Sequence, residues 1–257
     1  MAKNDILYFH TGVRKDHKVV ALLDGDIVAV KSAAVFDAHD GYEESYLHML
    51  VRKTVNDWVK ACGADDFVVC MSKGRSFRYD AYPKYKSNRT QPKPRGTDEA
   101  KQYLRDAYPT YEHDTLEADD VMGILGTEPQ DKEIRVIVST DKDMLQIPSW
   151  QFNPDRDRWP HKPDMDACHK FLAYQTTCGD PGDGYPGIPG FGIARFKKWW
   201  KNGETQVSLE VFLDNGLTLK DWTAQYDCAK MLLWNDRPED FLKDTSKTPV
   251  TDDECPF

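Results

Sequence analysis

The sequence has no apolar run of the length that crosses a membrane. A transmembrane helix needs about 20 consecutive apolar residues, and no stretch of the 257-residue chain approaches this length. The first residues also lack the basic, apolar and small-residue order of a secretory signal. We therefore expect a cytoplasmic protein with no membrane partner.

Cysteine is scarce, and its spacing does not indicate a metal site. The six cysteines form no Cys-x-x-Cys pair and stand in no ligand spacing with histidine, which argues against a zinc motif or a disulfide framework. We expect reduced cysteines that pack in the interior. With 40% apolar and 12% aromatic residues, the composition is that of a globular protein. The sequence contains no internal repeat.

Acidic residues outnumber basic ones, 43 to 34, which gives a formal net charge of −9, but one segment has a strong excess of basic residues. Residues 73–95 hold eight basic residues against a single acid, Asp80. The aromatic residues between these cations are Phe77, Tyr79, Tyr82 and Tyr85. Cations that contact phosphates and rings that stack on bases are typical of a single-strand channel, which favours nucleic-acid binding over a solvated charged loop. The candidate DNA contacts in the segment are Lys73, Arg75, Arg78 and Lys84.

Short apolar runs alternate with amphipathic stretches in the first part of the chain. Buried strands are predicted for the apolar runs at 19–24, 67–71 and 134–139. Apolar residues at helical spacing predict helices over 42–61 and 117–125. This alternation is typical of an α/β fold with a mostly parallel sheet flanked by helices, whose functional groups lie at the carboxyl ends of the strands. After residue 163 the pattern is helical only, so we expect a boundary there.

Eight carboxylates follow the predicted strands, begin a predicted helix or flank a glycine-rich turn: Asp24, Glu117, Asp119, Asp120, Asp141, Asp143, Asp180 and Asp183. If the fold brings them to one cleft, their mutual repulsion requires cations. Hard oxygen ligands suit Mg²⁺ or Mn²⁺, and two such ions about 3.5–4 Å apart clamp the attacking and leaving oxygens of a phosphodiester displacement. Each group alone also fits an acidic helix start or a turn, but their joint occurrence favours metal binding.

A glycine-rich segment follows the last two of these acids. Its glycines let backbone N–H groups approach an anionic backbone without interference from side chains. A helix that begins near Ile193 adds the positive end of its dipole, and Lys197, Lys198 and Lys201 extend the surface. The candidate DNA contacts are Gly187, Gly190, Gly192, Ile193, Lys197 and Lys198. Because such contacts ignore base identity, we expect recognition of DNA structure rather than sequence.

Four motifs together resemble those of the flap endonuclease and 5′-3′ exonuclease family, which includes the 5′-nuclease domain of bacterial DNA polymerase I. They are YPKYKSNR at 82–89, EADD at 117–120, STDKD at 139–143 and GDPGDGYPGIPGFG at 179–192. The resemblance covers roughly residues 19 to 200 and is strongest to the stand-alone exonucleases of tailed bacteriophages. It implies a PIN-like nuclease domain over 1–163, with a helical arch at about 72–96 for a 5′ single strand. It further implies a helical DNA-binding region over 164–257, with a helix-three-turn-helix at about 175–201.

The resemblance also assigns roles to the residues of these motifs. It implies that the eight carboxylates hold two divalent metal ions, and that Lys86 and Arg89 contact the scissile phosphate beside Tyr85. The hairpin at 187–192 would grip duplex DNA, in many relatives with a potassium ion held by its carbonyl groups. The implied activity is that of a structure-specific 5′-3′ exonuclease or flap endonuclease, which leaves 5′-phosphate and 3′-hydroxyl products. Its implied setting is DNA replication or repair in the host cytoplasm, with RNA–DNA hybrids as a further substrate and replication proteins as partners.

One position departs from the family pattern. The family places an aspartate fifteen residues before the arch lysine, where this chain has Met71, and a thioether is a poor magnesium ligand. This departure leaves open a relative that binds DNA flaps without cutting them. A more distant alternative is a phosphatase of the haloacid-dehalogenase type, because Asp24 and Asp26 fit its opening motif. That alternative leaves the basic segment and the glycine hairpin unexplained.

Overall fold

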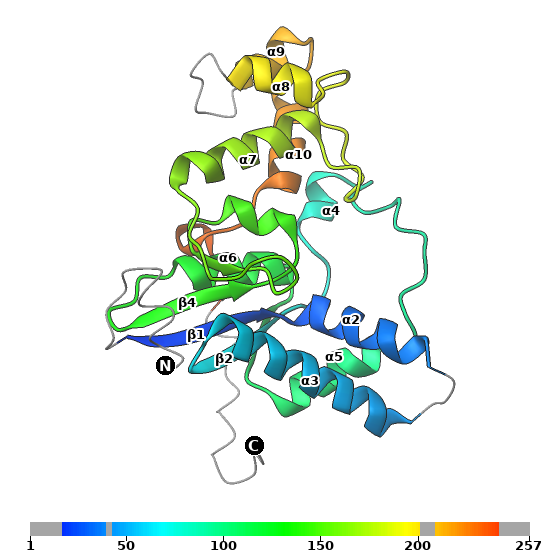
Figure 1. Cartoon of the computed structure of the whole chain (residues 1–257). Coiled ribbons are helices and arrows are strands. Elements are labelled where there is room, and N and C mark those ends of the chain that lie inside the picture. Colours follow the sequence, from blue (N-terminus) through cyan, green and yellow to red (C-terminus); the bar gives the residue numbers. More distant parts are fainter. Residues whose placement is uncertain (1–16, 40–42, 201–208, 242–257) are drawn as a thin grey trace.

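The computed structural model describes residues 17–39, 43–200 and 209–241. They contain a five-stranded sheet with the strand order β3-β2-β1-β4-β5 (Figure 1). The strands are β1 (Lys18–Asp24), β2 (Asp66–Ser72), β3 (Thr110–His113), β4 (Glu133–Val138) and β5 (Trp150–Phe152). All neighbouring strands are parallel, which confirms the predicted sheet. The nearly continuous apolar run of β1 suits this central place, because a central parallel strand is buried on both faces.

Helices cover both faces of the sheet (Figure 1). The helices of this part are α2 (Gly25–Asp37), α3 (Glu44–Cys62), α5 (Thr97–Ala107) and α6 (Ala118–Thr127). Successive β1 side chains point to opposite faces, so Leu23 packs in a cluster with Phe36 and Val51 under α2 and α3. Leu22 packs in a second cluster with Val121 of α6. The two clusters hold the sheet between helical layers, as predicted for an α/β fold.

After β5, all the regular elements that the structure describes are helices, joined by turns and loops at 153–164 and 179–192. The elements are α7 (Met165–Cys178), α8 (Ile193–Trp200), α9 (Leu209–Asp214), α10 (Leu219–Ala229) and the 3₁₀ helix η2 (Trp234–Asp236). A third hydrophobic cluster joins them through Ala173, Phe191, Phe196 and Phe212. This confirms the predicted helical pattern, whereas the division into two domains at residue 163 stays a prediction.

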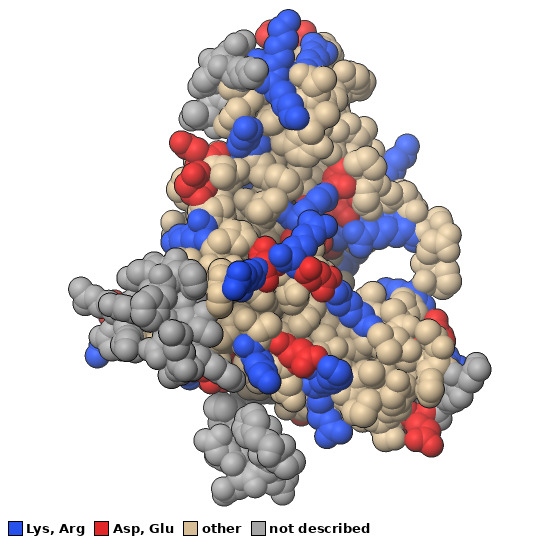
Figure 2. Space-filling model, in the orientation of Figure 1, with Lys and Arg blue, Asp and Glu red and all other residues tan. Residues whose placement is uncertain are grey.

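The basic segment at 72–96, hereafter the arch, contains one short helix, α4 (Arg78–Ala81). Turns and extended backbone follow it as far as residue 96. Pro92 and Pro94 explain this, because proline lacks the N–H that a helix interior needs. The segment runs from α4 along the side of the molecule to α5 (Figure 1), and the space-filling view shows an opening between it and the body (Figure 2). The segment therefore borders an opening and has helix only at its base, and its role as an arch for a 5′ single strand stays a prediction.

Two further expectations concern the cysteines and membrane insertion. The five cysteines within the described ranges are free, and four of them are buried, which agrees with the expected packing role. Cys255 lies outside the described residues.

None of the described helices combines the length and the apolar character that a membrane crossing requires.

Candidate active site

Three acids lie at the carboxyl edge of the sheet, where functional groups of parallel α/β folds gather. Asp24 is the last residue of β1, and Asp141 and Asp143 follow β4 at the 3₁₀ helix η1 (Lys142–Gln146). Burial, and after it the charge of Asp26, raises the pKa of Asp24 to about 7. Burial, followed by the charge of Asp141, raises the pKa of Asp143 to about 6. An added cation would therefore stabilise the charged forms of both carboxylates.

Glu117 and Asp119 bring two more acids to this edge from the start of α6. Burial raises the pKa of Asp119 well above its ordinary value, and the next causes are the charges of Asp24, Asp141 and Glu117. These groups thus share one region of negative potential. Their hard oxygen donors fit a divalent ion such as Mg²⁺ or Mn²⁺. Within the described ranges, however, no three His, Cys, Asp or Glu side chains stand at metal-binding spacing.

The base of the arch contacts two of the predicted metal ligands. The hydroxyl of Tyr85 lies 2.8 Å from Asp183 Oδ2 and 2.9 Å from Glu117 Oε2. Lys86 Nζ forms an ion pair with Glu117 and lies 3.9 Å from Asp183 Oδ2, and Arg89 pairs with the other oxygen of Asp183. Basic side chains accordingly surround acidic ones on this face (Figure 2). The fold thus gathers all three predicted catalytic residues around Glu117 and Asp183.

Lys86 has a backbone conformation that few residues other than glycine adopt. Its φ is 54°, in the left-handed region that is unfavourable for L-residues with a side chain. The surroundings hold it there, because the Lys86 N–H donates to the carbonyl oxygen of Asp183 at 2.7 Å. Backbone strain of this kind persists only where neighbouring contacts fix it, and it is common at functional sites.

Lys142 links the acids of η1 to the turn that follows α7. Its Nζ lies 2.5 Å from Asp180 Oδ2 and 3.1 Å from Asp143 Oδ1. Burial lowers the pKa of Lys142, but the hydrogen bond to Asp180 and the charge of Asp143 outweigh it, so the pKa is raised overall. The sequence analysis did not assign a role to Lys142. Its place between two predicted ligands, Asp141 and Asp143, is the signal that could have found it.

Two uncharged side chains also belong to the site and were not predicted. Ser139 Oγ donates to Asp24 Oδ2 at 2.7 Å, and Gln175 Nε2 donates to Asp143 Oδ1 at 2.6 Å. Both donors are buried, so they fix the acids that they contact. Ser139 lies in a motif that the sequence analysis used, whereas nothing in the local sequence marks Gln175 of α7.

Arg78 and Asp120 form a buried structural pair beside Glu117, whose Oε2 lies 3.3 Å from Arg78 Nη1. Arg78 has no exposed surface, and its guanidinium makes two hydrogen bonds to the carboxylate of Asp120. Asp120 is also fully buried and accepts from the N–H groups of Glu117 and Leu232. The prediction that Arg78 contacts DNA is therefore wrong, because a phosphate would have to enter the interior. These donors occupy the Asp120 carboxylate, so we assign it a structural role in place of the predicted metal ligation.

The other predicted contacts on the arch remain accessible. Arg75 and Lys84 are exposed, and Lys73 is half-buried with its Nζ 3.0 Å from Asp114 Oδ1. Arg75 pairs with Asp80, and both of these side chains face solvent. A strand that passes the arch can reach all three cations, whose DNA contacts stay predictions.

The predicted contacts of the glycine hairpin divide into a buried and an exposed group. Gly187 is buried, and its N–H donates to Gln225 Oε1 at 2.7 Å. A Cβ at Gly187 would lie 2.3 Å from the backbone nitrogen of Gly179, so the close approach of two chain segments requires glycine here. The prediction that Gly187 offers its N–H to DNA is therefore wrong. The exposed group comprises Gly190, Gly192, Ile193, Lys197 and Lys198.

Residues 19–154 match the family model for the 5′-3′ exonuclease N-terminal resolvase-like domain. The chain belongs to this 5′-3′ exonuclease family. It is 33% identical over 201 residues to the exodeoxyribonuclease of Enterobacteria phage T3, a match that covers 69% of this chain and 65% of that protein. It is 32% identical over 200 residues to the exonuclease of Escherichia phage T7, with the same coverage of 69% and 65%. The chain thus spans slightly less than two thirds of these two relatives.

Solved structures of the 5′-3′ exonuclease family share this fold. The 5′-exonuclease of phage T5 with bound zinc matches with a TM-score of 0.59 at 22% identity, over 82% of this chain and 84% of that one. The flap endonuclease of bacteriophage T5, in complex with DNA and metal ions, matches with a TM-score of 0.58 at 18% identity, over 82% and 88%. Family membership leaves the haloacid-dehalogenase alternative without support, because Asp24 and Asp26 lie in the matched exonuclease domain.

Neutralising Asp119 is expected to stabilise this exonuclease-family chain when no divalent metal is present. In EDTA, Asp119→Asn removes a half-buried charge that its acidic neighbours oppose. The midpoint of thermal unfolding should therefore rise by about 2–4 °C, which corresponds to roughly 1 kcal/mol in a chain of this size. Manganese should then raise the midpoint of the variant less than that of the wild type, because one ligand charge is gone. Differential scanning calorimetry measures both changes.

The matched control for this prediction is Asp98→Asn, which neutralises an exposed acid in the first turn of α5. It should leave the response to manganese unchanged, because Asp98 lies on the surface. A lower midpoint for Asp119→Asn in EDTA would contradict the repulsion argument.

Proposed function

We propose that this chain is a metal-dependent, structure-specific 5′-3′ exonuclease or flap endonuclease that hydrolyses DNA at 5′ ends or flaps. The observation that carries the proposal is the contact of Tyr85 and Lys86 with Glu117 and Asp183. In this contact the basic base of the arch meets acids whose oxygen donors fit divalent ions. The phage relatives named as exonucleases support the same reaction.

Seven acids would hold the two divalent ions: Asp24, Glu117, Asp119, Asp141, Asp143, Asp180 and Asp183. When bound, Mg²⁺ or Mn²⁺ supplies Lewis acidity at the phosphate and lowers the pKa of a water molecule. Lys86 and Arg89 neutralise the charge that develops on the nonbridging oxygens in the transition state. Tyr85 positions Glu117 and Asp183 through its hydroxyl. The products would carry a 5′-phosphate and a 3′-hydroxyl.

The hairpin and α8 would hold the duplex part of the substrate. Gly190, Gly192 and Ile193 present exposed backbone before or at the start of α8, where a helix N-terminus attracts phosphate. Lys197 and Lys198 add exposed positive charge on the same helix. The proposal extends to a potassium ion at the hairpin carbonyl groups and to RNA–DNA hybrids as a second substrate. It also extends to a role in DNA replication or repair, with replication proteins as partners. These contacts predict affinity that falls as salt rises, with little dependence on base sequence.

A cleavage assay tests the proposed function. Duplex DNA with a 5′ overhang or a 5′ flap, labelled at either end, is incubated with the protein in Mg²⁺, in Mn²⁺ and in EDTA. We expect label to leave the 5′ end only with metal, and the remaining strand to begin with a 5′-phosphate. Mapping products from both labels separates stepwise exonuclease release from cleavage at the flap junction.

Met71 favours a second candidate function, DNA binding without cleavage. Its side chain is fully buried in the cluster that holds Leu23 and Val69, so apolar packing replaces the carboxylate that the resemblance leads us to expect. Stable binding of flap DNA with no product at saturating Mn²⁺ would favour this candidate. Cleavage at any metal concentration would exclude it.

A further inference from the structure

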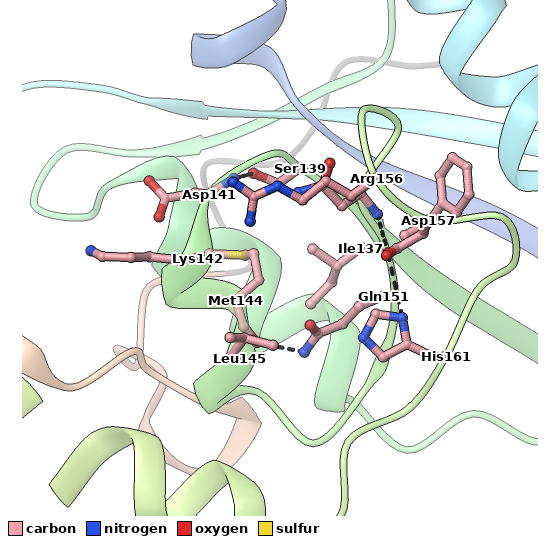
Figure 3. Close-up of a pocket in the computed structure, with 12 residues that line it drawn as sticks. Ile137, Ser139, Asp141, Lys142, Met144, Leu145, Gln151, Arg156, Asp157 and His161 are labelled. Atoms are coloured by element: carbon pink, nitrogen blue, oxygen red, sulfur yellow. Dashed lines mark hydrogen bonds and ion pairs between the residues drawn. The ribbon is translucent and has the colours of Figure 1, made fainter. Parts of the chain in front are cut away.

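A cavity of about 180 Å³ lies beside the candidate active site (Figure 3). One wall consists of Ser139, Asp141 and Lys142, which belong to that site. The opposite wall is the loop after β5, with Asn153 and Arg156. The proposed cleavage reaction uses neither residue of this loop. The cavity is smaller than the roughly 300–1,000 Å³ of sites that enclose a whole small-molecule ligand, so it encloses only part of a ligand, and the rest of that ligand lies at the open rim.

The loop that forms the outer wall is fixed by hydrogen bonds. The N–H of Asn153 donates to Asp157 Oδ2 at 2.7 Å, and Gln151 and His161 exchange two backbone hydrogen bonds of 2.7 and 2.9 Å. His161 Nδ1 lies 3.4 Å from Asp157 Oδ2, which leaves its second nitrogen available. The wall is therefore preformed, and a ligand would not have to order it.

Arg156 is the residue of this wall that could bind an anionic ligand. It is exposed, and its guanidinium has no hydrogen bond or ion pair with any other residue that the structure describes. The side chain extends along the mouth of the cavity toward Asp141 (Figure 3). A guanidinium presents paired donors that match a phosphate. Arg156 adds positive charge beside Asp141 and Asp157 at this rim, so a phosphate meets less repulsion here than at the acids beyond Asp141.

Beside the buried Gln151, the floor of the cavity is apolar. Ile137, Met144 and Phe152 are almost fully buried there, and Leu145, which is 40% exposed, offers most of the apolar surface. An apolar floor beneath a guanidinium, with amide and imidazole groups at the rim, matches the chemistry of a nucleotide, in which a sugar joins a planar base to a phosphate. We propose that the cavity is a nucleotide subsite: it takes one nucleoside 5′-monophosphate unit, with the phosphate on Arg156 and the base against the apolar floor. The assignment of that unit to DNA beside the cleavage centre rests on the proposed function.

Nucleotide binding without metal tests this proposal separately from cleavage. In EDTA, thymidine 5′-monophosphate, thymidine and inorganic phosphate are each titrated into the full chain and followed by isothermal calorimetry. We expect the monophosphate to bind. Arg156→Ala should weaken it at least about tenfold, the loss typical of a charge-assisted hydrogen bond. Leu145→Trp should weaken thymidine and the monophosphate by a similar factor, because it fills the floor without removing charge.

Arg158→Ala is the matched control, because Arg158 lies on the same loop, stacks over Trp159 at 5.5 Å from the ring centroid and does not line the cavity. It should leave monophosphate binding unchanged, and circular dichroism checks that every variant is folded. The proposal is overturned if the monophosphate does not bind, if Arg156→Ala and Leu145→Trp bind it as the wild type does, or if Arg158→Ala weakens it equally. Cleavage with no monophosphate binding would reject the subsite alone. Cavity-dependent binding with no cleavage would reject the proposed function and keep the subsite.

Discussion

Replacing Arg78 by methionine is expected to lower the free energy of unfolding by about 3–5 kcal/mol, the usual cost of removing one partner of a buried ion pair. The guanidinium has no exposed surface and binds Asp120 through two hydrogen bonds. It also donates to the carbonyl oxygens of Cys228 at 3.1 Å and Lys230 at 2.6 Å. Methionine fills similar space, but it leaves a buried carboxylate and two carbonyl groups without this donor.

Urea denaturation followed by circular dichroism measures this loss. The matched control is Arg75→Met on the same arch, which breaks a pair with Asp80 whose side chains are 60% and 77% exposed. That change should cost at most about 1 kcal/mol, as surface pairs do. Adding Asp120→Leu to Arg78→Met should recover part of the loss, because no uncompensated charge remains in the interior. A loss below about 1 kcal/mol for Arg78→Met would show that water reaches the pair.

The same pair shows why part of the site could not be predicted from the sequence. The motif at 117–120 presents three acids that look equivalent, and the basic segment presents Arg78 as one cation among eight. In the fold, Asp120 lies at the third position of α6 and turns inward to Arg78, 42 residues away. Asp119 lies among the charges of the other acids, whereas Glu117 contacts both Arg78 and Lys86 at the base of the arch. Sequence spacing identifies acids at a helix start, but only tertiary contacts decide which of them face a ligand.

The predictable features of the fold are those encoded by local pattern. The apolar runs at 19–24, 67–71 and 134–139 become β1, β2 and β4, because a continuous apolar run suits a strand buried on both faces. β3 and β5 were not predicted, since strands of four and three residues are too short to show a period. They complete the edges of the sheet, where pairing with β2 and β4 compensates for a weak local signal.

The glycine hairpin shows a second limit of prediction from sequence. Glycine-rich sequence is compatible both with exposed N–H groups for a phosphate and with close packing of two chain segments. At Gly187 the glycine serves close packing, because Gly179 approaches it and its N–H donates to Gln225, 38 residues further on. At Gly190 a Cβ would meet nothing within 4 Å, so that position stays open to a ligand. The two uses differ only in which group approaches the glycine, and the local sequence does not contain this information.

Replacing Lys86 by alanine is expected to reduce the rate of DNA cleavage by about 100- to 1,000-fold, which corresponds to roughly 2.7–4 kcal/mol for the loss of one donor to developing negative charge. Lys86 is half-buried, forms an ion pair with Glu117 and lies close to Asp183. Its positive charge is therefore located where the scissile phosphate would approach these acids. Affinity for the duplex should change little, because many phosphate contacts elsewhere contribute to it. Single-turnover cleavage and fluorescence anisotropy measure the two quantities on one flap substrate.

The matched control for this prediction is Lys84→Ala, two residues away on the exposed side of the same turn. If Lys84 only contacts phosphates along the strand, its removal should slightly lower the affinity and the salt dependence of the affinity. The single-turnover rate at saturation should stay close to that of the wild type. Lys86→Ala should show the opposite pattern, because a group that acts only in the transition state changes the rate and not the binding. Equal losses of rate and affinity in both variants would mean that Lys86 is one more strand contact, and the catalytic role proposed for the base of the arch would have to be abandoned.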